Sequence, residues 1–160
     1  MPIATIDLYN IVLFVHILAV VVGFGVVFTY PLLDAYARRS RVADLVALHR
    51  FQSFLTQRLI QPALLVILVA GIYLATDRWK LSDPWISATF AILIVIGAIA
   101  GAIIGPTEKR CLALAQRDLG GGGKPSDEYE GQAIKLARFG GLASLLITVA
   151  IFLMVTKPGA

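Results

Sequence analysis

The stretch FVHILAVVVGFG, residues 14–25, decides the fold of this chain. It contains no Asp, Glu, Lys or Arg, and the uncharged run around it extends from Ile11 to Leu33. A helix that crosses the hydrocarbon core of a membrane needs about 20 mostly apolar residues. The stretch therefore predicts a membrane-spanning helix. His16 is an ionisable residue inside it, which is costly in a membrane and usually has a reason.

The composition of the whole chain supports a membrane protein. Hydrophobic residues make up 58% of the 160 residues and charged residues 15%, and the mean hydropathy is +0.82. Soluble domains have about 45–50% apolar and about 25% charged residues. The first seven residues, MPIATID, contain no Lys or Arg. A secretory signal peptide has a positive n-region, so we expect the first apolar segment to be a retained membrane helix.

Four apolar segments carry no Asp, Glu, Lys or Arg and predict four spans: 11–33, 59–75, 85–104 and 139–155. Helical spacing of apolar residues extends the helices beyond these spans. The fold class expected is an all-α, polytopic membrane four-helix bundle with helices at approximately 8–39, 42–76, 85–119 and 127–156. We expect a single domain over residues 1–160. Four consecutive glycines predict a flexible linker at 120–126 between the last two helices.

The distribution of basic residues predicts the orientation in the membrane. The net charge is +4, but it does not indicate nucleic-acid binding, because the basic residues gather in two loops between helices. The loop after the first helix and the loop after the third carry most of the Lys and Arg residues, and positive loops stay in the cytoplasm. We therefore expect these two loops inside and both termini outside.

Small residues at four-residue spacing predict close helix packing. Gly97, Gly101 and Gly105 form a double GxxxG ridge, and Ala19 and Gly23 have the same spacing on the first helix. Such ridges let membrane helices approach closely. The pattern does not say whether the partner helix belongs to the same chain or to another copy. We favour packing within the chain, since a compact four-helix unit needs such contacts.

Prolines fall near the predicted inner ends of three helices: Pro31, Pro62 and Pro106. Proline bends a helix and frees a backbone carbonyl. One interpretation is a bent, hydrated vestibule lined by Gln57, Arg58 and Gln61. The other is that the prolines only end or kink their helices, and we favour this simpler one.

His16 is the best candidate for chemistry. A histidine on a membrane helix is a familiar axial ligand of haem iron. His49 lies beyond the inner end of the first helix, too far away to bracket the same haem, and Met154 lies several ångströms from the level of His16. The alternatives are a hydrogen bond from His16 across the bundle, for example to Ser144 or Thr148, and a proton or ion role. His49 is expected to be interfacial and solvated.

The residues YNIVLFVHILAVVVGFGVVFTYPLL and HRFQSFLTQRLIQPALLVILVAGIYLATDRW resemble bacterial predicted integral membrane proteins of unknown function. The wider resemblance is to copper-resistance D-type proteins and the J-type protoporphyrinogen oxidase. His16 matches a first-helix histidine implicated in haem binding in that oxidase. The lysine of the oxidase's third helix and the outward His and Met residues of the copper-resistance proteins have no counterpart here. The resemblance implies a fold, and the bacterial inner membrane, more than a reaction.

The sequence leads to two hypotheses of function. The first is a non-enzymatic accessory or interaction subunit, in contact with the lipid bilayer and with another copy or a membrane-complex partner. The second is a b-type haem protein with His16 as ligand. No phosphate loop, HExxH motif or pair of intramembrane carboxylates occurs in the sequence. The single Cys111 excludes an internal disulfide framework and a multi-cysteine zinc site, and we expect it to pack on a helix face.

Overall fold

The chain is helical throughout the residues that the computed structural model describes, 7–37, 39, 42–120 and 124–159, and these ranges contain no strand. Within them, four helical rods are long and apolar enough to cross a membrane. The elements are α1 (Leu8–Ala37), α2 (Val42–Leu55), η1 (Thr56–Ile60), α3 (Gln61–Arg78), α4 (Pro84–Ile99), η2 (Ala100–Ile104), α5 (Gly105–Gly120) and α6 (Asp127–Thr156). Elements α2, η1 and α3 form one continuous rod, and α4, η2 and α5 form another.

The four predicted helices are confirmed, with ends that differ by one to two residues. The first helix was expected to reach residue 39 and ends at Ala37, while residue 38 lies outside the described part. Glycines 121–123 of the predicted linker also lie outside it. The start of α6 is capped, because the Ser126 hydroxyl accepts a hydrogen bond of 3.3 Å from the Tyr129 N–H.

Each of the two continuous rods contains a π-helical turn just before a proline. The Gln61 N–H donates to the Thr56 carbonyl ahead of Pro62, and the Gly105 N–H donates to the Ala100 carbonyl ahead of Pro106. Proline has no N–H, and its ring clashes with the carbonyl four residues earlier, so the wider turn accommodates it. Pro31, by contrast, lies inside α1, which continues to Ala37.

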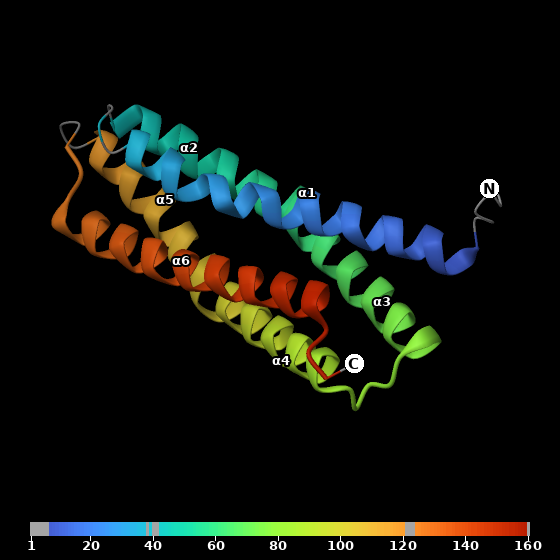
Figure 1. Cartoon of the computed structure of the whole chain (residues 1–160). Helices are drawn as coiled ribbons and strands as arrows, with labels where there is room; N and C mark the ends of the chain where they lie inside the picture. The colour runs from blue at the N-terminus through green and yellow to red at the C-terminus, as the bar shows by residue number, and fades with distance from the viewer. Residues whose placement is uncertain (1–6, 38, 40–41, 121–123, 160) are drawn as a thin grey trace.

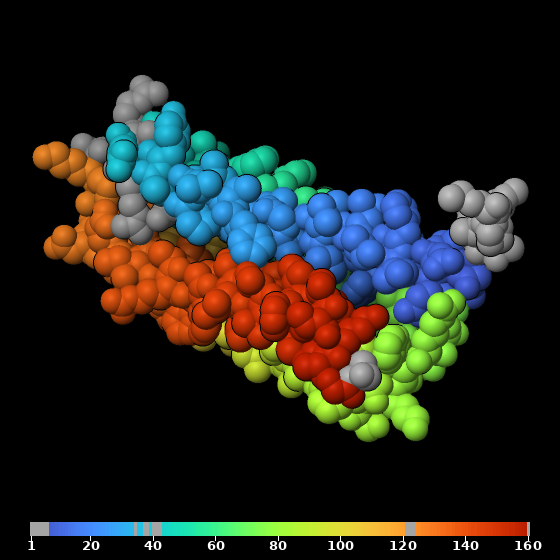
Figure 2. Space-filling view, viewed as in Figure 1, coloured from blue at the N-terminus to red at the C-terminus, as the bar shows by residue number. Residues whose placement is uncertain are grey.

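The rods lie side by side at one end of the molecule and separate at the other (Figure 1). We call the end where α2, α5 and the start of α6 lie the loop end, and the opposite end the terminal end. The most extensive packing is between α1 and α3, α4 and α6, and α2 and α5. The rods that contain α2 and α5 therefore touch at the loop end, whereas α3 and α4 make no extensive contact beyond the π turns. Figure 2 shows α1 and α6 covering one face.

Three hydrophobic clusters hold the rods together at different points along the bundle. The loop-end cluster contains Leu45, Val46, Cys111, Leu114, Ala115, Tyr129 and Ala133. The central cluster contains Ala19, Phe24, Ile67, Ile96 and Ile147, and a third near the terminal end contains Ala75, Trp85 and Ile86. Large apolar side chains on the outer faces of the rods are exposed, as lipid-facing residues are. Cys111 is fully buried in the loop-end cluster, so it packs on a helix face as expected.

The expected glycine contacts divide into two groups. A Cβ atom placed on Gly23 would lie 2.7 Å from the Ala63 Cβ, so α1 and α3 approach closely there, and Ala19 is buried in the central cluster. A Cβ on Gly97 or Gly101 would meet nothing within 4 Å, and one on Gly105 would meet only the Ala100 carbonyl. The close packing that we favoured on the Gly97–Gly101 ridge therefore stays a prediction.

Candidate functional site

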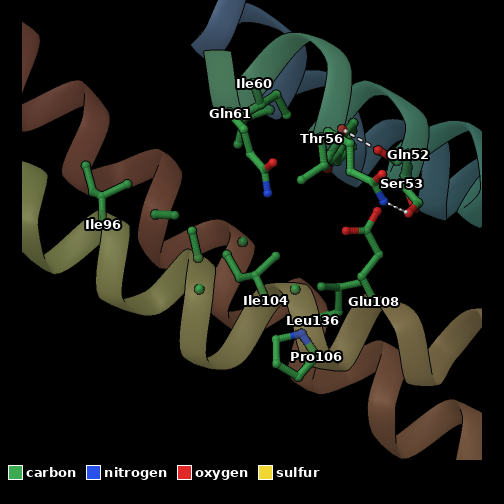
Figure 3. A pocket seen from close by; sticks show the side chains of 18 of the residues that line it. Gln52, Ser53, Thr56, Ile60, Gln61, Ile96, Ile104, Pro106, Glu108 and Leu136 are labelled. Carbon is green, nitrogen blue, oxygen red and sulfur yellow. Dashed lines mark hydrogen bonds between the residues drawn. The ribbon is translucent and has the colours of Figure 1, made fainter. Parts of the chain in front are cut away.

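A cavity of about 1090 Å³ lies between the two π turns, in the space where α3 and α4 separate. All four rods line it, and Figure 3 shows side chains from the η1 rod and from the η2 rod on opposite sides. Gly97, Gly101 and Gly105 form part of its wall. The absence of side chains on these glycines therefore leaves room for the cavity.

The lining changes from polar to apolar along the cavity. Towards the loop end it includes polar side chains from η1, α2 and α5: His49, Gln52, Ser53, Thr56, Gln57, Arg58, Glu108 and Lys109. Towards the middle of the bundle it is formed by apolar side chains such as Phe24, Leu64, Ile96 and Ile147. Gln57, Arg58 and Gln61 all contribute. The interpretation that the prolines only end or kink helices is thus incomplete, because the two π turns border a real cavity.

Glu108 is the buried carboxyl group of this site. Its side chain is 6% exposed, and in Figure 3 it extends from α5 into the space that Gln61 enters from the other side. Thr56 of η1 lines the same cavity. The Oε1 atom is buried and has no hydrogen-bond partner among the described residues. One side of the carboxyl group is therefore free to accept a hydrogen bond from the cavity.

His49 closes the loop end of the cavity, and the expectation that it is solvated is wrong. It is 1% exposed. Its Nδ1 lies 3.1 Å from the Gln52 Oε1 and its Nε2 lies 2.9 Å from the Tyr129 hydroxyl, with the two rings edge to face at 5.8 Å. The Tyr30 hydroxyl donates to the Gln52 carbonyl at 3.5 Å. Because His49 shares the helical face of Leu45 and Val46, the spacing itself indicated burial.

His16 is buried between α1 and α3 and not against α6. Its exposure is 7%, and a Cβ on Gly71 would lie 3.3 Å from its Cε1. The Ser144 and Thr148 hydroxyls donate to carbonyls of their own helix at 3.0 and 2.9 Å. The expected bond across to these two residues is therefore absent.

The surroundings of His16 do not fit a haem in this arrangement. Its Nδ1 is buried and without a partner in the described part of the chain, which would suit a ligand. However, α3 covers the ring at Gly71, and His16 lines neither the central cavity nor the apolar groove between α1 and α3. For a metal ion held directly by protein side chains, residues 7–37, 39, 42–120 and 124–159 contain no group of three or more His, Cys, Asp or Glu residues.

Comparison with known proteins gives a family match. A family model described as "Predicted integral membrane protein (DUF2269)" matches residues 10–158. No curated protein and no solved structure matches the chain. The wider resemblance to copper-resistance and protoporphyrinogen oxidase proteins is thus not supported by these comparisons.

Proposed function

Because this chain belongs to the DUF2269 family of predicted integral membrane proteins, whose description names no activity, we propose a function from its cavity. We infer that it is a non-enzymatic accessory protein of the bacterial inner membrane that holds an amphipathic small molecule. The cavity of about 1090 Å³ between the two π turns is the observation that carries this proposal.

The size of the cavity suits a small molecule. Ligand pockets measure about 300–1,000 Å³, and the cavity is close to the upper end of that range. Gly97 and Gly101 line this space, and their lack of side chains leaves room for a bound molecule.

The shape of the molecule favours entry from the bilayer. The α3 and α4 helices make no extensive contact between the π turns and the cluster of Ala75, Trp85 and Ile86, and their outer faces are apolar and exposed. An amphiphile already dissolved in the membrane can place its chain among Phe24, Ile96 and Ile147 and its head group among the polar residues near the loop end. Its binding needs no passage through water.

Filling the cavity tests the proposal. Gly101→Phe places a large side chain where a Cβ meets nothing, so the fold is expected to persist while the cavity shrinks. Gly25→Phe is the matched control, because Gly25 is equally open and does not line the cavity. Native mass spectrometry of protein released from lipid nanodiscs should show bound dodecyl amphiphiles in wild type and Gly25→Phe. They should be absent in Gly101→Phe. Equal binding in both variants contradicts the proposal.

Haem ligation by His16 is the second candidate, and its buried Nδ1, which has no hydrogen-bond partner among the described residues, supports it. It ranks second because of the packing of Gly71 on the ring. We expect the protein purified from haem-replete cells to have no Soret band. A Soret band that disappears in His16→Ala would reverse the ranking.

A further inference from the structure

We propose that Glu108 binds the primary ammonium head group of an amphipathic amine inside the cavity. This inference rests on the proposed function and names the chemical class of its ligand. It is carried by the position of Glu108, a carboxyl group that faces the cavity from α5 while the protein around it supplies only part of its hydrogen bonding.

The carboxyl group lacks the partners that a buried charge needs. Glu108 is 6% exposed, and its Oε1 has no hydrogen-bond donor among the described residues. No described Lys or Arg forms an ion pair with it. Burial of an unpaired charge is costly unless a cation or hydrogen-bond donors compensate it. An ammonium group supplies both the positive charge and three N–H donors.

The cations on the cavity wall do not fill this role. Arg58 and Lys109 line the cavity, but both side chains are exposed. Exposed charges keep much of their hydration, and salt screens them, so they select a head group weakly. The buried Glu108 is therefore expected to decide the preference. A phosphate head group would be favoured if Arg58 and Lys109 decided it instead, and the experiment separates these outcomes.

The cavity also fits the apolar part of such a molecule. The rod rises about 18 Å between Ile96 and Glu108. Phe24, Ile96 and Ile147 lie at the apolar end of the lining. An alkyl chain bound at Glu108 by its head group would extend towards these residues and the gap between α3 and α4. A small hydrophilic amine would leave that apolar surface uncovered, so we expect an amphiphile.

The test compares head groups on the full-length protein in nanodiscs of phosphatidylglycerol, a lipid whose head group has no amine. Native mass spectrometry measures the bound fraction of dodecylamine, dodecanol and dodecyl phosphate at equal concentrations. We expect dodecylamine to bind wild type about tenfold more tightly than dodecanol, the ratio that corresponds to about 1.4 kcal/mol. Glu108→Gln should abolish this preference. Asp127→Asn, which removes an exposed carboxylate outside the cavity, should retain it.

A second arm distinguishes a membrane lipid from a free amine. Lysophosphatidylethanolamine carries the same ammonium group on a phosphodiester, and lysophosphatidylglycerol lacks it. Preference for the first over the second, lost in Glu108→Gln, supports a lipid source, and preference for dodecylamine alone supports a free amine.

The outcomes separate this inference from the proposed function. Binding of all dodecyl compounds without a preference for the amine, or preference for the phosphate, overturns the inference alone. Binding of none of them to wild type, or equal binding to Gly101→Phe, overturns the proposed function as well. The head-group comparison on wild type needs no variant, so it decides the matter even if Glu108→Gln does not fold.

Discussion

At the residue scale, the sequence neighbours of the two histidines do not indicate which of them lines the cavity. His16 stands in an uncharged membrane segment, yet it packs against a glycine of α3 outside the cavity. His49 stands beside Arg50 in a polar-looking stretch, yet it is 1% exposed and both its ring nitrogens have partners. The sequence did not indicate that Glu108 is buried either, because in TEKRC, residues 107–111, it resembles the other charged residues of an amphipathic helix.

His49 should matter for stability more than its neighbours do. His49→Ala leaves the buried Tyr129 hydroxyl and Gln52 amide without the imidazole and opens a cavity in the loop-end cluster. We expect the free energy of unfolding to fall by about 3 kcal/mol. Arg50→Ala, an exposed position next to it, should change it by less than about 0.5 kcal/mol. Thermal unfolding in nanodiscs measures both, and equal effects would show that the His49 bonds contribute little.

At the element scale, the contact between α1 and α3 depends on the missing side chain of Gly23. A Cβ there would lie 2.7 Å from the Ala63 Cβ, so Gly23→Ala must push the helices apart. Overpacking of this kind costs about 2 kcal/mol. Gly25→Ala meets nothing within 4 Å and should be neutral or stabilising by up to about 1 kcal/mol.

A double-mutant cycle checks the cause of this effect. Adding Ala63→Gly to Gly23→Ala restores the space between the helices, so the pair should be more stable than the sum of the single effects. Additive effects would mean that Gly23 acts through something other than this contact.

The junction of α5 with α6 should make stability depend on pH. It lies beyond the apolar spans 85–104 and 139–155. Hydrogen bonds from the Ser126 N–H and hydroxyl, together with Arg117, hold the pKa of the Asp118 carboxyl below its usual range. Arg110 and Arg117 likewise lower the pKa of Glu128. A lowered carboxyl pKa in the folded state stabilises the protein above the unfolded pKa.

The contribution of Asp118 and Glu128 to the melting temperature should therefore be constant above about pH 5 and decrease below about pH 4. As the pH passes down through the folded pKa values, the carboxyl groups bind protons and this contribution is lost. We call the fall of the melting temperature below about pH 4 the acid limb. The double variant Asp118→Asn with Glu128→Gln should have a shallower acid limb. Asp77→Asn, at the terminal end, should retain the wild-type limb. An unchanged limb in the double variant would exclude these two groups as its origin.

The helices were predictable, whereas the cavity was only the less favoured of two interpretations of the prolines, for physical reasons visible at the elements. Apolar runs, the Ser126 cap and the four glycines determine where helices begin and end, and these are local features. Pro62 and Pro106 predicted bends but not π turns, because the choice between a kink and a wider turn depends on neighbouring rods. The Gly97–Gly101 ridge indicated a close approach, yet whether a helix or a space lies opposite depends on how far α3 diverges from α4.

At the scale of the whole molecule, the length of the rods indicates which part lies in the membrane. The rod Pro84–Gly120 has 37 residues and is about 55 Å long, while the hydrocarbon core is about 30 Å thick. Much of α5 must therefore extend beyond the core. The polar end of the cavity is the end nearer α5, so an amphiphile bound there would have its head group near that surface and its chain towards the bilayer interior.

The side of the membrane on which α5 extends is the last prediction. Lys109, Arg110 and Arg117 lie on α5, and the terminal end has few basic residues besides Arg78, Lys80 and Lys157. Since positive loops stay in the cytoplasm, α5 and the polar end of the cavity should face inward. An alkaline phosphatase fused after Gly120 should be inactive and one fused after Ala160 active, with green fluorescent protein fusions giving the opposite pattern. Activity after Gly120 would invert the molecule and place the Glu108 end of the cavity towards the outside.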